Sequence, residues 1–377
     1  MTIDQLRLRG ADYQTALPPR CYTDPDFLAL ELEKVFRRDW ICIGHVADIP
    51  AAGDYITFDL PGLRVMAVRQ QDGSVKVLSR VCRHRAALLG REGGGKATLF
   101  VCPYHCWTYE LDGRLRGAPA MSGSSGFRRE DCRLPEFRSQ VWESLIFLTC
   151  SPAAEDLSAS LEATRARLEP YRLSELKTAF AIEEVWNTNW KVAVENGSES
   201  YHHGGVHRQT LEPLFPTTGV RAEPGGLWYN MHAVPASIDF SFEGGQEDRP
   251  SATQLNSSLG PQQLRELLIL GIYPNLVIAF AGACVTVFRF VPVNVAQTLV
   301  RATWLVPASY LELANADAVL ERDRRTLQAI IAEDRASCAD VQVGLSCLDA
   351  PAAGPLAPIE RPIGEFGSYL RRRLCGD

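Results

Sequence analysis

Two Cys/His pairs lie close together in the first third of the sequence. One residue separates Cys82 from His84, 17 residues follow, and two residues separate Cys102 from His105. Thiolates and imidazoles at this spacing bind either one tetrahedral Zn²⁺ ion or a Rieske [2Fe–2S] cluster, in which two His replace two Cys on one iron. Zinc fingers usually take both Cys from one segment and both His from the next. Here each segment supplies one of each, which favours the cluster.

A second group of possible ligands, Glu199, His202 and His207, follows a helical pattern. If that helix persists, Glu199 and His202 share one face because they are three residues apart. On a continuous helix His202 and His207 would diverge by about 140°. We therefore expect Gly204 and Gly205 to break the helix and let the chain bring His207 back.

Two imidazoles need a carboxylate to form the facial triad that holds Fe(II) with open positions for O₂ and substrate. A long helix is predicted over residues 316–345, and its apolar stripe consists of Leu327, Ile331, Cys338, Val341 and Leu345. Asp334 falls on this stripe, where an isolated carboxylate is too costly, so we expect it to be paired or bound to metal. Glu333 points about 100° away and is the weaker candidate.

The elements that position these residues change character along the chain. A first helix is predicted with Thr23 or Asp24 as its cap, Pro25 in its first turn and an apolar stripe of Leu28, Leu32, Val35 and Phe36. Short β runs then extend from Trp40 to about Cys150, at residues 55–58, 64–68, 75–78, 98–101 and 145–148. The dipeptide Asp72–Gly73 between two of them indicates a hairpin.

The remaining sequence reads as helices and one sheet. Residues 151–180 are polar and helical in character, and another helix starts near Asn187 or Thr188 and runs towards Glu199. Extended runs then occupy residues 227–234, 267–272, 276–280, 285–291 and 299–306. These runs suit a curved antiparallel sheet, followed by the long helix.

Length and composition limit the class of protein. The chain has 377 residues, which favours two domains, and its 46% apolar and 22% charged residues are typical of a globular protein. A net charge of −6, with no basic run longer than Arg371–Arg373, argues against nucleic acid as a partner. The first 14 residues lack an apolar core and no apolar run could span a bilayer, so we expect neither a secretory signal nor membrane insertion. Eleven cysteines then favour the cytoplasm, with the scattered ones as small buried hydrophobes.

The two Cys/His loops resemble those of Rieske proteins, whose oxygenase members carry Cys-x-His-Arg-Gly and Cys-Pro-Tyr/Phe-His-Gly-Trp. Residues 82–85 and 102–107 match these patterns at every ligand, although Ala86 and Cys106 stand where glycine is usual. Those two substitutions bear on loop geometry and cluster potential. The disulfide that joins the loops in respiratory Rieske proteins is absent, which favours the oxygenase or ferredoxin branch; its two positions are Ala87 and Tyr104. Cys106 is expected to be a packed thiol.

The later segments resemble the α subunits of Rieske non-haem iron oxygenases, in which Asp/Glu-x-Tyr-His-x₄-His precedes an acidic pair and Val-Gln-x-Gly-Leu. The matching residues are Glu199, Tyr201, His202, His207, Glu333, Asp334 and residues 341–345. The resemblance covers about residues 35–350. It implies that Cys82, His84, Cys102 and His105 hold a [2Fe–2S] cluster and that His202, His207 and Asp334 hold mononuclear Fe(II).

The resemblance also implies partners. Glu199 would bridge His202 to His105 of the neighbouring chain in a homotrimer, so that the cluster of one chain serves the iron of the next; alternatively, Glu199 is an ordinary solvated carboxylate. A separate flavin and iron–sulfur reductase, or a ferredoxin, would supply electrons from NAD(P)H. Asn196 and Tyr201 are candidates for contacts that support the iron ligands. The other histidines considered are expected to be structural: His45, His203 and His232.

The fold implied is α+β. A small all-β Rieske domain, residues 41–150, would be inserted into a helix-grip-type catalytic domain, residues 151–377, with a curved antiparallel sheet and a long C-terminal helix. Residues 1–40 would form a helical segment that packs on the catalytic domain.

The substrate is the least constrained feature. Glu199, the chain length and the Val-Gln-x-Gly-Leu sequence look most like oxygenases that demethylate or cleave quaternary amines such as betaines and carnitine. Trp228 and Tyr229 could form a cation–π cage, but packing in the sheet is the favoured interpretation. Hydroxylation or dihydroxylation of an aromatic or other apolar substrate is the alternative reaction. A Rieske electron carrier would need only residues 40–150, and a zinc-stabilised binding module is a third alternative.

Overall fold

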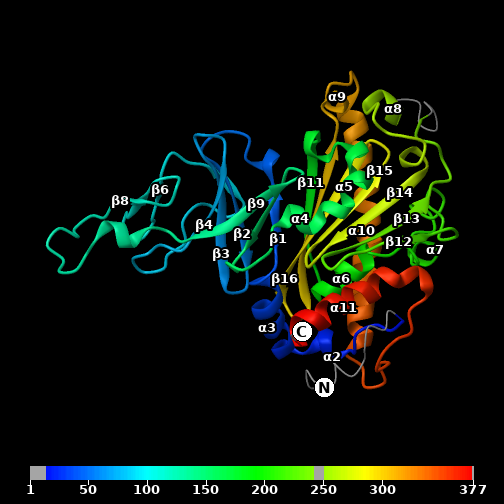
Figure 1. Cartoon of the computed structure of the whole chain (residues 1–377), viewed down its shortest axis with the longest axis horizontal. Coiled ribbons are helices and arrows are strands. Elements are labelled where there is room, and N and C mark those ends of the chain that lie inside the picture. The colour runs from blue at the N-terminus through cyan, green and yellow to red at the C-terminus, as the bar shows by residue number, and fades with distance from the viewer. Residues whose placement is uncertain (1–13, 242–249, 376–377) are drawn as a thin grey trace. The chain divides into compact units, whose positions relative to one another are not determined.

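The computed structural model describes residues 14–241 and 250–375 (Figure 1), so the N-terminal residues judged to lack a secretory signal mostly lie outside the described part. The chain forms two compact units. One, which we call the inserted unit, comprises residues 37–154. The other, which we call the main unit, comprises residues 1–36 and 155–377, so the N-terminal segment groups with it. The expected insertion of one domain into another is confirmed.

The inserted unit is built from β-strands. Seven strands form a sheet in the order β1-β10-β9-β4-β3-β2-β5, and β6, β7 and β8 form a smaller one. Gly73 has a φ of +83° between the antiparallel strands β3 and β4, as the predicted hairpin requires. The strands are β1 (Ile41–His45), β2 (Asp54–Leu60), β3 (Leu63–Arg69), β4 (Val75–Ser79), β5 (Gly94–Lys96), β6 (Phe100–Val101), β7 (Thr108–Tyr109), β8 (Leu115–Gly117), β9 (Glu136–Trp142) and β10 (Leu145–Thr149).

The main unit contains a seven-stranded antiparallel sheet in the order β11-β17-β16-β15-β14-β13-β12. All five predicted runs lie in it, which confirms the antiparallel sheet. The prediction missed β11, because residues 151–180 were expected to be helical throughout and the strand already begins at Lys177. The strands are β11 (Lys177–Trp186), β12 (Arg221–Glu223), β13 (Tyr229–Pro235), β14 (Glu266–Ile272), β15 (Leu276–Ala281), β16 (Cys284–Asn294) and β17 (Gln297–Val306).

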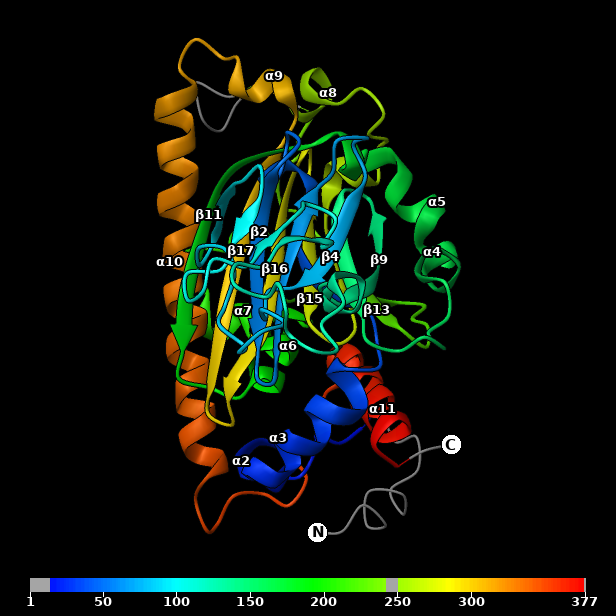
Figure 2. The ribbon, with the colours of Figure 1, turned by 90° about the vertical axis from the view of Figure 1, so that its left-hand side faces the viewer.

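The long helix α10 (Ala316–Leu345) has the predicted bounds and runs beside β11 (Figure 2). Its buried face includes Asp334 together with Val319, Asp323, Leu327, Ile331, Cys338 and Gln342. The prediction that Val341 lies on this face is wrong, because Val341 is exposed. Gln342 takes that place, four residues after Cys338, and its amide hydrogen-bonds Asn189 N (2.7 Å) and Tyr22 O (3.3 Å).

The remaining helices are shorter than α10. The helix α3 (Pro25–Glu31) has Asp24 as its N-cap, as predicted, and continues as the π-helix η1 (Leu32–Phe36). No helix in the described ranges is both long and apolar enough to cross a bilayer. The others are α2 (Arg20–Thr23), α4 (Leu157–Leu161), α5 (Arg165–Leu168), α6 (Trp190–Gly197), α7 (His203–Val206), α8 (Ala252–Leu255), α9 (Ala308–Leu311) and α11 (Arg361–Cys375).

Helix α6 is held by buried charges from the N-terminal helices. Lys191 Nζ lies 2.8 Å from Glu31 Oε1, and the indole Nε1 of Trp190 donates to Glu31 Oε2 at 2.8 Å. Four residues after Lys191 on the same helix, Glu195 accepts a hydrogen bond from the hydroxyl of Tyr22 at 2.7 Å. Buried charges are tolerated only when they are paired and hydrogen-bonded. These contacts therefore hold α6 in place just before the segment that contains Glu199, His202 and His207.

Candidate metal centres

The two Cys/His loops of the inserted unit have the same backbone design. In the first, Ala86 N donates to Cys82 O (3.1 Å); in the second, Cys106 N donates to Cys102 O (3.0 Å). Ala86 and Cys106 both have positive φ, +60° and +57°, which only glycine adopts without strain. The glycine-like geometry is therefore present although neither residue is glycine. We call residues 82–86 and 102–106 the cluster loops.

The cysteine and histidine ligand candidates of the cluster loops differ in solvent exposure. The thiols of Cys82 and Cys102 are buried, whereas His84 is exposed and His105 partly exposed. The two imidazole rings lie side by side, with centroids 4.6 Å apart. The Nδ1 of His105 is buried and has no hydrogen-bond partner, as expected of a metal-ligating atom. Burial, with help from His84 and Arg85, lowers the pKa of His105, which favours the neutral imidazole that binds metals.

These four residues fit two irons better than one zinc ion. Around tetrahedral Zn²⁺, ligand atoms at 2.0–2.3 Å from the metal would lie within about 4 Å of one another. Within residues 14–241 and 250–375, no three atoms of these Cys and His residues come within 4.8 Å of one another. A cluster that holds two thiolates on one iron and two imidazoles on the other matches this wider spacing.

Two aromatic residues that sequence reasoning missed support the loops. The hydroxyl of Tyr109 accepts a hydrogen bond from Arg83 N (3.0 Å) and lies 3.3 Å from Cys82 Sγ, to which it would donate when Cys82 is a thiolate. Trp107 stacks on His84, with ring centroids 4.9 Å apart and an interplanar angle of 9°. Cys106, which was expected to be packed, is exposed.

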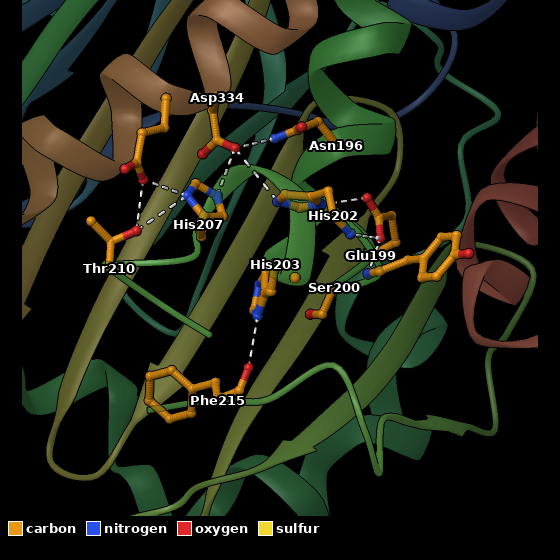
Figure 3. A network of polar contacts seen from close by, with 12 residues as sticks. Asn196, Glu199, Ser200, His202, His203, His207, Thr210, Phe215 and Asp334 are labelled. Atoms are coloured by element: carbon orange, nitrogen blue, oxygen red, sulfur yellow. Dashed lines mark hydrogen bonds and ion pairs between the residues drawn. The ribbon is translucent and has the colours of Figure 1, made fainter. Parts of the chain in front are cut away.

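The second centre lies in the main unit (Figure 3). His202 Nε2 lies 3.5 Å, and His207 Nε2 2.9 Å, from Asp334 Oδ1. One nitrogen of each imidazole and one oxygen of Asp334 lie within 4.8 Å of one another, the single such group in the described part of the chain. The structure therefore brings together the three residues singled out from the sequence, which we call the triad.

A carboxylate fixes the orientation of each triad imidazole. Glu199 contacts His202 Nδ1, and Glu333 Oε2 lies 2.7 Å from His207 Nδ1 and accepts from Thr210 Oγ1 at 2.6 Å. A carboxylate on Nδ1 keeps the proton there and leaves Nε2 free to bind a metal. Burial lowers the pKa of His207, but the hydrogen bonds and charges of Asp334 and Glu333 outweigh it and raise the pKa. Glu333, the weaker ligand candidate, thus supports His207 instead.

The path of the chain between Glu199 and His207 differs from the prediction. Helix α6 begins at Trp190 with Asn189 as its N-cap and ends at Gly197, so Glu199 and His202 do not share a helix face. They meet in a turn, in which Glu199 Oε2 accepts from His202 N at 3.3 Å. The expected break at Gly204 and Gly205 is also wrong, since both lie inside α7. Neither glycine has positive φ.

The remaining candidates occupy distinct places. Asn196 Nδ2 donates to Asp334 Oδ1 at 2.9 Å. Tyr201 contacts Glu199 through its backbone N, while its side chain is 52% exposed. His203 Nδ1 hydrogen-bonds Phe215 O (3.0 Å), and His232 Nε2 lies 2.8 Å from Ser200 Oγ. Burial lowers the pKa of His203 to about 4 and that of His232 to about 3, so both are neutral.

Three further expectations can be compared with the structure. His45 is structural, as expected, because its Nδ1 caps η2 (Val46–Asp48) by accepting from Ala47 N (3.1 Å). Tyr229 is buried in β13, and the guanidinium of Arg373 covers Trp228 at 4.6 Å, so these aromatics form no open cage. The scattered cysteines are buried only in part: Cys21, Cys42, Cys338 and Cys375 are buried, Cys132, Cys150 and Cys284 are half-buried, and Cys347 is exposed.

Comparisons with known proteins agree with this geometry. The chain matches the family model of the ring hydroxylating alpha subunit (catalytic domain) over residues 163–376, and that of the Rieske [2Fe-2S] domain over residues 39–138. It is 31% identical over 374 residues to the glycine betaine monooxygenase oxygenase subunit of Chromohalobacter salexigens, with 92% of this chain and 82% of that protein covered.

Two further similarities extend the picture. The chain is 34% identical over 195 residues to the biphenyl 2,3-dioxygenase subunit alpha of Rhodococcus jostii, with 50% of this chain and 42% of that protein covered. The crystal structure of the quaternary ammonium Rieske monooxygenase CntA in complex with γ-butyrobetaine superposes with a TM-score of 0.80 at 22% identity. It covers 99% of both chains, which shows a shared fold.

Proposed function

This chain belongs to the family of ring-hydroxylating oxygenase α subunits with a Rieske [2Fe–2S] domain, and we propose that it oxidises an N-methyl group of a small quaternary amine. Members of this family are oxidoreductases that carry a Rieske cluster and a mononuclear iron. They act with O₂, a small organic substrate and electrons from a separate reductase. The observation that carries the substrate class is the similarity to a glycine betaine monooxygenase over 92% of the chain.

The proposed reaction is the oxidative removal of one N-methyl group as formaldehyde. One oxygen atom of O₂ enters a C–H bond of an N-methyl group, and the other leaves as water with two protons and two electrons from the reductase. The C–N bond of the resulting carbinol then breaks. Its electron pair stays on nitrogen, and formaldehyde and a proton are released.

We assign the four Cys and His residues of the cluster loops to the [2Fe–2S] cluster and the triad to Fe(II). When bound, these groups supply single electrons and the activation of O₂. The protein's own part is positioning: Glu199 and Glu333 hold the proton on Nδ1 of each triad imidazole, and Asn196 holds Asp334 by one oxygen.

We further propose that the chain works as a head-to-tail homotrimer. In this arrangement Glu199 links His202 to His105 of the partner subunit, so electrons pass between centres on different chains. Two features support it: Glu199 already contacts His202 Nδ1, and His105 lies at a partly exposed edge of the cluster loops. A head-to-tail contact closes into a ring when its rotation allows. Electrons from NAD(P)H would reach the cluster through a flavin and iron–sulfur reductase or a ferredoxin.

A cytoplasmic location agrees with the state of the cysteines. All eleven are free of disulfides, although several are exposed or half-buried. Free thiols and a thiolate-bound cluster persist in a reducing compartment.

Product analysis after a single turnover tests the substrate class. Enzyme reduced with a chemical reductant is exposed to O₂ with either quaternary N-methyl amines, among them glycine betaine, carnitine and γ-butyrobetaine, or aromatic acids and hydrocarbons. We expect formaldehyde and the demethylated amine in equal amounts, and neither product from His207→Ala. Hydroxylated aromatic products without formaldehyde would instead support the aromatic reaction suggested by the similarity to the biphenyl dioxygenase subunit.

A further inference from the structure

Arg83 and Arg85 make the exposed end of the cluster loops positively charged. Both side chains are exposed, and neither forms an ion pair with an acidic residue in the described chain. The guanidinium of Arg85 lies 5.0 Å from the ring centroid of Tyr104, and its Nη1 donates to the Tyr104 hydroxyl at 2.9 Å. Arg85 also acts electrostatically on His105. An arginine held beside a cluster histidine by a neutral partner keeps its charge available to a carboxylate.

The main unit carries a residue of opposite charge to Arg85. It is Glu360, in the short helix η8 (Pro358–Glu360). Its Oε2 accepts from Ala357 N at 2.7 Å, but no Lys or Arg among the described residues pairs with it. Burial raises the pKa of Glu360 and the hydrogen bond from Ala357 N lowers it; the negative charge of Glu199 raises it and His202 lowers it by smaller amounts. Glu360 therefore lies within electrostatic range of both residues that the proposed function places at the electron-transfer contact.

One hydrogen bond anchors this segment to β13, close to the same turn. Asn230 Nδ2 donates to Pro362 O at 3.0 Å, two residues after Glu360. The amide of Asn230 in turn lies beside Ser198: a Cβ atom at Gly271 would come within 2.4 Å of Asn230 Oδ1 and 3.3 Å of Ser198 Oγ. Because Ser198 directly precedes Glu199, the backbone near Glu360 lies close to the segment that presents the bridging carboxylate.

The charges of the two units are complementary as a whole. Residues 37–154 contain 16 Lys and Arg against 12 Asp and Glu, a net charge of +4. The remaining residues contain 23 Lys and Arg against 33 Asp and Glu, a net charge of −10. A positive surface on one chain that meets a negative surface on the next favours the head-to-tail contact over contacts between like units.

We propose that Arg85 of one chain pairs with Glu360 of the next and thereby sets the position of His105 against Glu199. This inference rests on the trimer of the proposed function and adds a charge pair that orients the contact. The geometry of the charge pair follows from the residues that lie near Arg85 in one chain and near Glu360 in the next. Arg85 lies within electrostatic range of His105 on one surface, and Glu360 lies within electrostatic range of Glu199 on the other, so closing the His105–Glu199 contact brings the two charges together. Arg85 and Glu360 are positioning residues, because neither contacts the iron ligands.

A charge swap tests the pair. The variants are Glu360→Arg, Arg85→Glu and the double variant, with Glu312→Arg as a control that makes the same charge change at an exposed acid elsewhere in the main unit. Each is characterised by the visible spectrum of the cluster, by the mass in solution, and by the rate at which reduced cluster is oxidised in a single turnover. Glu360→Arg is the primary variant because it leaves the cluster loops untouched.

We expect each single variant to slow cluster oxidation about tenfold or more, the double variant to recover most of the rate, and the control to match wild type. The effect of Glu360→Arg should shrink as ionic strength rises. Wild-type rates in Glu360→Arg, or a double variant no faster than the slower single variant, would overturn the pairing. Failure of the trimer itself would look different: wild type would be monomeric, or Glu199→Gln would leave cluster oxidation unchanged.

Discussion

The cluster loops lie within 25 residues of one another in the sequence, whereas His207 and Asp334 of the triad are 127 residues apart. The loops take their shape from the backbone, through two repeated turns with a residue of positive φ at the same place in each. The triad takes its shape from side chains, because Glu199, Glu333 and Asn196 orient its members from separate elements. Substitutions that change the backbone should therefore affect the cluster, and substitutions that remove a carboxylate should affect the triad.

Glu333→Gln should have the largest effect among variants that leave all proposed ligands in place. It removes the carboxylate on His207 Nδ1, so the imidazole is free to rotate or change tautomer. We expect Fe(II) affinity and turnover to fall roughly 10- to 100-fold, with an unchanged cluster spectrum. Titration of iron-depleted enzyme with Fe(II) measures the affinity. Thr210→Val, which removes only the hydroxyl that supports Glu333, serves as a milder control, and equal iron affinity in Glu333→Gln and wild type would contradict the role.

The pH dependence of stability should differ between wild type and Glu195→Gln. Burial raises the pKa of Glu195 from 4.5 to about 7, against the opposing effects of Tyr22 and Lys191. A raised pKa means that its contribution to stability is complete below pH 4.5 and is lost as the pH rises through 7. Wild type should lose on the order of 2 kcal/mol between pH 5 and 8 that Gln, which mimics the protonated acid, does not lose. Parallel unfolding curves of the two proteins across this range would refute the prediction.

Tyr109→Phe should change the electronic properties of the cluster and leave the triad intact. The Tyr109 hydroxyl would donate to a thiolate at Cys82 Sγ and so stabilise the more negative, reduced cluster. Loss of about 1 kcal/mol from the reduced state lowers a one-electron potential by roughly 40–50 mV. Spectroelectrochemical titration gives the value. Tyr55→Phe is the control variant. The Tyr55 hydroxyl accepts a hydrogen bond from Arg91 N in the same inserted unit and does not contact a cluster-loop sulfur.

Ala86→Gly and Cys106→Gly should each stabilise the cluster loops slightly. Both residues have positive φ, so glycine relieves strain, although it adds freedom to the unfolded chain. We expect a net gain of about 0.5–1 kcal/mol per site, seen as slower thermal bleaching of the cluster. Ala87→Gly, at a residue of negative φ, should instead destabilise. Faster bleaching in both glycine variants would show that their present side chains contribute contacts that outweigh the strain.

The sequence predicted the cluster loops well because their geometry is local. It also predicted the bounds of α10 and the buried place of Asp334, since a 30-residue amphipathic pattern leaves little choice. The path from Glu199 to His207 was mispredicted because spacing alone cannot distinguish a helix face from a turn that brings the same side chains together. The contact of Tyr109 with Cys82, 27 residues apart, and that of Glu333 with His207 depend on tertiary packing, which local patterns do not encode.

The central claim is that one chain holds two iron centres of different kinds, and the most direct test is the amount of iron and acid-labile sulfide per chain. Reconstituted wild type should contain three irons and two sulfides, as two cluster irons plus one mononuclear iron require. The double variant His207→Ala with Asp334→Ala should fall to two irons and two sulfides, keep its visible spectrum and lose turnover. A wild type with only two irons, or a double variant that retains three irons and full turnover, would contradict the account.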